Sequence, residues 1–124
     1  MENLFQSGAF KLNSGKFSNF KIECDALTQD DIDTFAFLIS QNYSFKEVVG
    51  VPTGGIRIEE ALKKYCTNDD SLPLLIVDDV LTTGGSMERY KKTKEDLGYN
   101  NIIGVVLFAR NECPEWIAPV FQMW

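Results

Sequence analysis

One thirteen-residue segment, residues 74–86, constrains the fold of this chain more than any other part of its sequence. It opens with the apolar run 74–77, which is too short to cross a membrane and is typical of a strand buried in a parallel sheet. Two adjacent carboxylates follow, Asp78 and Asp79. Five small residues complete the segment: Thr82, Thr83, Gly84, Gly85 and Ser86. The pattern predicts a buried strand that turns sharply into a helix.

Strand-like and helix-like patterns alternate along the rest of the chain. Strands are expected over 17–24, 48–51, 74–77, 102–109 and 116–124. Helices are expected over 29–39 with Thr28 as the N-cap, over 56–65, and over 86–97 with a stop at Gly98. This order predicts an α/β fold, with a mainly parallel sheet and helices on both faces. A length of 124 residues fits a single domain, 1–124.

The chemistry expected of this fold lies beyond the carboxyl ends of its parallel strands. Two Gly-rich turns, at Gly54-Gly55 and Gly84-Gly85, stand at such ends. Backbone N–H groups at a helix N-terminus bind anions, because they are unpaired and lie at the positive end of the helix dipole. Asp78 and Asp79 would repel a phosphate, so they must face sugar hydroxyls or a cation. A ligand that carries phosphate, ribose and a divalent ion satisfies every part.

Composition excludes several classes of function. The chain has no histidine, which rules out Ser–His and Cys–His nucleophiles and His metal sites. A net charge of −6 argues against nucleic acid or an anionic membrane as the main partner. Cys24, Cys66 and Cys113 lack the spacing of disulfide or zinc sites and are expected to be buried small residues. With no visible signal peptide, these features favour the cytoplasm.

The segment 74–86 resembles the phosphoribosyl pyrophosphate (PRPP) signature of type I phosphoribosyltransferases, a Rossmann-like family. The resemblance implies that Asp78 and Asp79 hold the ribose hydroxyls and act in catalysis. It also implies that the five small residues wrap the 5′-phosphate: Thr82, Thr83, Gly84, Gly85 and Ser86.

Two other interpretations of this segment remain. A buried strand followed by a turn is common in α/β proteins and can be purely structural. An apolar run with two aspartates also resembles the magnesium strand of P-loop ATPases, although that interpretation needs an upstream Gly-x-x-x-x-Gly-Lys-Ser/Thr segment, which the sequence lacks.

The second Gly-rich turn gains meaning from the first. In the family, a loop at this position grips pyrophosphate through backbone N–H groups, often with a strained peptide. The matching residues are Pro52, Thr53, Gly54 and Gly55. Arg57 adds charge to this loop or is a solvated helix residue.

Two further segments resemble orotate phosphoribosyltransferases. Residues 10–16, Phe-Lys-Leu-Asn-Ser-Gly-Lys, match a Phe-x-Leu-x-Ser-Gly-Arg/Lys pattern. Residues 107–112 match the end of a late strand, where an Arg binds orotate. The resemblance implies that Ser14 and Arg110 contact the base, since a guanidinium pairs well with a carboxylate. The alternative for Arg110 is a surface charge at a strand end.

The chain is an abbreviated version of this pattern. Orotate enzymes carry a Lys where Asn13 stands and a mobile basic loop between the two Gly turns, whereas about sixteen residues separate the turns here. The leading hypothesis is a magnesium-dependent orotate phosphoribosyltransferase of pyrimidine biosynthesis, active as a homodimer. In it Mg²⁺ is held through the substrate and not directly by protein ligands. The alternatives are a non-catalytic module that binds PRPP or a nucleotide, and an interaction domain with a vestigial site.

Overall fold

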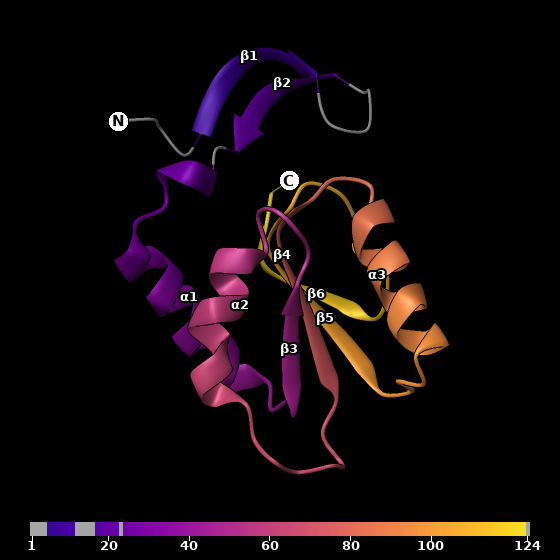
Figure 1. The fold of residues 1–124 in the computed structure, drawn as a ribbon. Helices are drawn as coiled ribbons and strands as arrows, with labels where there is room; N and C mark the ends of the chain where they lie inside the picture. Colours follow the sequence, from indigo (N-terminus) through magenta and orange to yellow (C-terminus); the bar gives the residue numbers. More distant parts are fainter. Residues whose placement is uncertain (1–4, 12–16, 23, 124) are drawn as a thin grey trace.

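The computed structural model describes residues 5–11, 17–22 and 24–123, arranged as Figure 1 shows. The strands are β1 (Phe5–Lys11), β2 (Phe17–Ile22), β3 (Glu47–Gly50), β4 (Leu74–Leu81), β5 (Ile102–Ala109) and β6 (Ile117–Gln122). The helices are α1 (Gln29–Asn42), α2 (Ile56–Leu62) and α3 (Gly85–Asp96), with 3₁₀ turns over Cys24–Ala26 and Lys63–Tyr65. The predicted order of strands and helices is confirmed from β2 onward.

The main sheet has four parallel strands in the order β3-β4-β5-β6. This confirms the predicted α/β class. Strand β4 is longer than its apolar run, because it continues through Leu81. Asp78 and Asp79 therefore lie inside the strand, where the sheet fixes their backbone, and not in the turn that follows.

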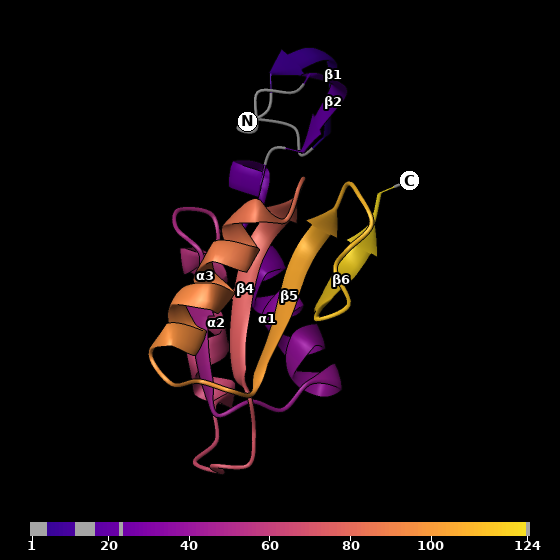
Figure 2. The same ribbon diagram turned by 90° about the vertical axis from the view of Figure 1, so that its right-hand side faces the viewer.

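Both faces of the sheet are covered, as Figure 2 shows. Leu75, Val77 and Leu107 pack against α1 and α2 in one core cluster. Ile76 and Val106 pack in a second cluster on the opposite face, where Met87 of α3 covers them. The alternation of side chains along β4 and β5 produces these two cores, since neighbouring residues of a strand point to opposite faces.

The two helical crossovers of the sheet have opposite hands. The steps β3 to β4 and β4 to β5 run in the same direction across the sheet, yet α2 and α3 lie on opposite faces. Crossovers between parallel strands are right-handed in about 98% of cases, so one of these two is of the rare kind. A strand order without reversal is unusual for a sheet that is covered on both faces.

Local signals set the helix ends as predicted. The Thr28 side chain accepts a hydrogen bond from the Asp31 N–H (3.1 Å), and the Asp31 carboxylate accepts one from the Thr28 N–H (2.9 Å). This capping box starts α1. Gly98 has φ 101°, the left-handed conformation that ends α3 and that glycine adopts with least strain.

The N-terminal strands form a separate antiparallel hairpin that was not fully predicted. β1 pairs with β2, and the hairpin lies beyond the carboxyl end of the main sheet in both ribbon views (Figures 1 and 2). No strand was expected over residues 5–11. The small residues Ser7, Gly8 and Ala9 hide the alternation there, and only pairing with β2 defines the strand.

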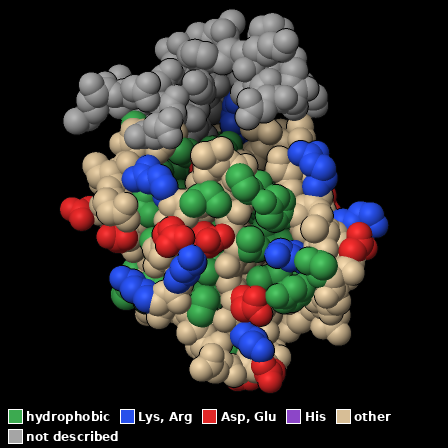
Figure 3. Space-filling model, in the orientation of Figure 1, with side chains coloured by type: hydrophobic (Ala, Val, Ile, Leu, Met, Phe, Trp, Pro, Cys, Tyr) green, Lys and Arg blue, Asp and Glu red, His purple; other side chains and the backbone are tan. Residues whose placement is uncertain are grey.

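Three features of the surface complete the fold. Phe121 is 48% exposed on the edge strand β6, where its ring stacks on Phe108 at 5.8 Å between centroids. Cys24, Cys66 and Cys113 form no disulfide with one another and are half-buried, so the expectation that they are buried is wrong. On the face in Figure 3, basic and acidic side chains are interspersed. No helix of the described residues is long and apolar enough to span a bilayer.

Candidate functional site

The predicted site residues from three strands gather at one end of the sheet. Strands β3, β4 and β5 end at Gly50, Leu81 and Ala109, and because they are parallel their carboxyl ends meet at the same edge. The loop after each strand carries one of the motifs found in the sequence. The fold therefore brings together segments that are up to sixty residues apart.

The loop after β4 is built to receive an anion. Gly84 has φ 83° and is the N-cap of α3, and no side chain caps the helix. The Thr83 hydroxyl makes only a long contact with the Gly85 N–H, at 3.4 Å. The loop walls a small hollow of about 40 Å³, which the Asp78 side chain also lines. Open N–H groups at the start of a helix attract phosphate.

The acid pair is held by the strand itself. Asp78 accepts a hydrogen bond from the Asp79 N–H (2.8 Å), and Asp79 accepts one from the Val80 N–H (2.7 Å). Both side chains are half-buried. The pKa of Asp78 is raised to about 8, mainly by burial and secondly by the neighbouring charge of Asp79. Asp78 is half-buried and has no cation partner among the described residues. A ligand that stabilises the charge of this carboxylate would therefore fit here.

The second Gly-rich loop packs directly against this pair. A methyl group added to Gly54 would collide with the Asp79 carboxylate and displace it, so the two motifs touch at this point. The Pro52–Thr53 peptide bond is cis. The Val51 N–H donates to Val77 O at 2.9 Å, which fixes the loop to β4. The structure thus places the predicted phosphate loop, acid pair and pyrophosphate loop side by side.

Glu59 anchors this loop, and the sequence analysis did not single it out. Its carboxylate accepts a hydrogen bond from the Gly50 N–H at 2.7 Å, and its own N–H donates to Gly55 O at 2.9 Å. The available signal was an acidic residue in the first turn of the helix that follows the Gly-Gly pair. Arg57 turns away, because its guanidinium donates to Leu27 O at 3.0 Å.

The segment after β5 reaches the phosphate loop. The Arg110 N–H donates to Leu81 O at 3.0 Å, which sets Arg110 beside the end of β4. The Asn111 side chain donates to Thr82 O. Gln122 of β6 then donates to Ala109 O and Asn111 O, both at 3.1 Å. Asn111 and Gln122 were missed, because nothing in the local sequence marks a contact between strands.

Two expectations fall outside this geometry. Ser14 lies outside the described residues, as do residues 12–16 of the orotate-like segment. The connection between the two Gly turns is fully described: after α2 and Lys63–Tyr65 it returns to the start of β3, where Thr67 N–H donates to Phe45 O at 3.1 Å. It therefore stays at the amino end of the sheet, and no basic loop from it reaches the site.

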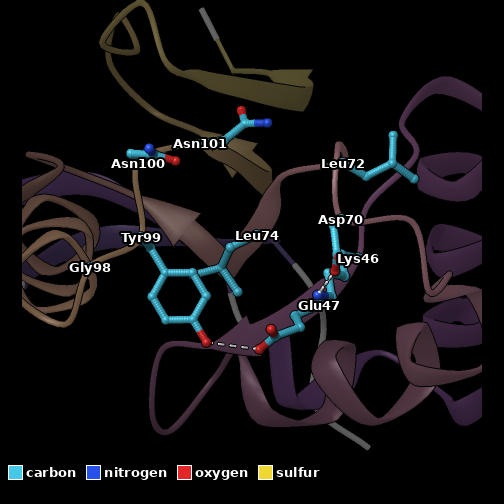
Figure 4. A pocket seen from close by; sticks show the side chains of 9 residues that line it. All are labelled: Lys46, Glu47, Asp70, Leu72, Leu74, Gly98, Tyr99, Asn100 and Asn101. Carbon is cyan, nitrogen blue, oxygen red and sulfur yellow. Dashed lines mark hydrogen bonds and ion pairs between the residues drawn. The ribbon is translucent and has the colours of Figure 1, made fainter.

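A second hollow, of about 180 Å³, lies at that amino end (Figure 4). Four of its polar side chains pair with one another: Lys46 forms an ion pair with Asp70, and the Tyr99 hydroxyl donates to Glu47 at 3.0 Å. Figure 4 shows both interactions as dashed lines between side chains that line the hollow. The carboxyl end, with its open N–H groups and an aspartate of raised pKa, is the better candidate site.

Comparisons with known proteins show what the chain resembles. No family model matches the chain. It is 29% identical over 140 aligned positions to the orotate phosphoribosyltransferase of Methanosphaera stadtmanae, and the match covers 89% of this chain and 77% of that protein. Since 89% of 124 residues is about 110, about 30 aligned positions have no counterpart here.

Solved structures show the same relationship. The orotate phosphoribosyltransferase of Aeropyrum pernix superposes with a TM-score of 0.67 at 25% identity, covering 88% of this chain and 77% of that chain. A purine phosphoribosyltransferase from Pyrococcus horikoshii shares the fold, with a TM-score of 0.54, 20% identity, and coverage of 79% and 93%. The chain is therefore similar in sequence and in fold to orotate phosphoribosyltransferases, which supports the family resemblance of the complete motif over residues 74–86.

Proposed function

We propose that this protein transfers the 5-phosphoribosyl group of PRPP to a ring nitrogen of orotate and releases pyrophosphate. The observation that carries the proposal is the contact between the Asp79 carboxylate and Gly54, which joins the acid pair to the pyrophosphate loop. The relatives named above support the enzyme over a non-catalytic PRPP-binding module.

In this proposal each group has one task. The open N–H groups of Thr83–Ser86 bind the 5′-phosphate, and those of Thr53 and Gly54 receive the pyrophosphate, since the Gly55 N–H already donates to Val51 O at 2.8 Å. Asp78 and Asp79 lie between these loops and accept hydrogen bonds from the ribose hydroxyls. Arg110, beside the end of β4, pairs with the carboxylate of the base, and Ser14 is proposed as a second base contact.

The reaction is a displacement at C1 of the ribose. The bond from C1 to the pyrophosphate oxygen breaks, a bond to the ring nitrogen forms, and any proton on that nitrogen leaves to solvent. The transition state resembles an oxocarbenium ion, as in glycoside chemistry. The ionised acid pair stabilises that positive charge, and the loop N–H groups stabilise the departing pyrophosphate, so the protein acts by positioning and electrostatics.

Magnesium fits the residues present. Asp78 and Asp79 offer adjacent oxygen ligands of the kind that a divalent cation prefers. A nearby cation would stabilise the charged form of Asp78, whose pKa is about 8 without it. In this proposal the cation is carried mainly by the substrate. Bound Mg²⁺ would neutralise the pyrophosphate, while Asp78 and Asp79 orient the ribose hydroxyls.

We also propose a cytoplasmic homodimer without a nucleic-acid or membrane partner. Three cysteines that form no disulfide with one another fit a reducing compartment. The connection between the Gly turns stays at the far end of the sheet, so a second subunit is the available source of a group that closes the site. Light scattering on the purified protein at several concentrations measures the assembly state, and a monomer at all concentrations would contradict the dimer.

Turnover tests the function. The protein is incubated with PRPP, Mg²⁺ and either orotate or a panel of other nucleobases, and released pyrophosphate is measured. We expect release with orotate and at least a 100-fold lower rate in Asp79→Asn. Tight PRPP binding without release for any base would favour the non-catalytic module. Release with a purine alone would overturn the choice of orotate.

A further inference from the structure

Arg89 lies against the phosphate loop, although it belongs to none of the motifs above. It stands one turn into α3, and its guanidinium Nη2 donates to the Ser86 hydroxyl at 3.3 Å. Its Nη1 lies 3.4 Å from the position that a Cβ on Gly85 would occupy. The guanidinium therefore folds back over the first turn of the helix, toward the open N–H groups of the loop.

This position is electrostatically unfavourable without an anion. A cation near a helix N-terminus adds to the positive end of the dipole, where acidic residues are normally preferred. In the part of the chain that the structure describes, no carboxylate lies within ion-pair distance of Arg89. Glu88, the acidic residue of this turn, accepts a hydrogen bond from the Trp116 indole N–H at 2.7 Å instead.

We propose that Arg89 is a direct ligand of the 5′-phosphate and closes the loop over it. Three positive features converge at this point: the helix N-terminus, the open loop N–H groups and the guanidinium. A phosphate dianion resolves their mutual repulsion, and the planar guanidinium can pair with two of its oxygens. The inference rests on the proposed function, since it assigns a new residue to the same PRPP site.

The test separates the two ends of the ligand. Calorimetry measures the affinity of wild type and Arg89→Gln for PRPP, for ribose 5-phosphate and for inorganic pyrophosphate, all with Mg²⁺. We expect Arg89→Gln to weaken PRPP and ribose 5-phosphate by about tenfold each, the effect of one charge-assisted hydrogen bond. Its affinity for pyrophosphate, which binds at the other loop, should stay within twofold of wild type.

Lys92→Gln is the matched control, since Lys92 is an exposed cation of the same helix, one turn farther from the loop. It should leave all three affinities unchanged. Arg89→Gln should unfold at the same temperature as wild type or slightly higher, because it removes a cation from the helix N-terminus, so misfolding is not expected to imitate the effect.

The outcomes are distinct. If wild type binds neither PRPP nor ribose 5-phosphate, the proposed function fails, and this inference fails with it. If wild type binds both and Arg89→Gln binds them equally well, only the role of Arg89 is overturned. An equal loss in Lys92→Gln, or an equal loss of pyrophosphate affinity in Arg89→Gln, would show a general effect of charge and would also overturn it.

Discussion

Replacing Asp78 with Asn should change how the stability of the protein depends on pH. In the folded protein the pKa of Asp78 is about 8, against 3.8 for an ordinary aspartate. A carboxyl group whose pKa is raised by folding binds more protons in the folded state, so stability falls as pH rises between the two values. Asn keeps the acceptor oxygen for the Asp79 N–H but cannot ionise.

The pKa values set the magnitude. One pKa unit corresponds to about 1.4 kcal/mol, so the difference of about four units gives a ceiling of about 6 kcal/mol above pH 8. Because Asp78 is only half-buried, solvent screening and local movement reduce this. Between pH 5 and pH 8 the unfolding free energy of wild type should fall by about 2–3 kcal/mol relative to that of Asp78→Asn.

Urea denaturation at a series of pH values checks this prediction. The comparison uses wild type, Asp78→Asn, and the control Asp96→Asn, which changes an exposed aspartate at the end of α3. Plotted against pH, the unfolding free energies of wild type and Asp78→Asn should converge near pH 4 and separate as pH rises. Asp96→Asn should follow wild type. Parallel curves for wild type and Asp78→Asn would refute the reasoning. Asp78→Asn should also bind PRPP more weakly, because the carboxylate is expected to accept hydrogen bonds from the ribose hydroxyls.

Three other substitutions test single contacts. Gly54→Ala should weaken PRPP binding at least tenfold by calorimetry, because its methyl group displaces the Asp79 carboxylate; unchanged affinity would contradict the contact. Asn111→Ala should weaken PRPP binding several-fold while lowering unfolding free energy by less than about 1 kcal/mol, because it frees the Thr82 carbonyl of the phosphate loop. Thr28→Ala should lower unfolding free energy by about 1 kcal/mol through loss of the capping box, with PRPP affinity unchanged.

Features encoded by neighbouring residues could be predicted from the sequence. The Thr28 cap, the stop at Gly98 and the strand over residues 74–77 depend on local patterns, and all three are confirmed. The two faces of the sheet follow from the alternation of strands and helices. Those parts fix where the site lies, because carboxyl ends of parallel strands share an edge.

Features that depend on pairing between distant segments could not be predicted. Strand β1 exists only through its partner β2, and Phe121 is exposed because β6 is an edge strand. The opposite hands of the two crossovers leave no mark on the sequence. The bonds from Gln122 through Asn111 to the phosphate loop join segments up to forty residues apart, so local patterns contain no sign of them.

A residue-resolved titration tests the central claim, that the loops around Asp78 and Asp79 form one PRPP site. In ¹H–¹⁵N spectra with Mg²⁺, PRPP should shift the amide signals of Gly84 and Gly85 together with those of Gly54 and Gly55. Ribose 5-phosphate should shift mainly the first pair, and pyrophosphate mainly the second. Shifts that leave all four glycines unchanged and appear instead at Tyr99, in the hollow at the amino end, would contradict the account.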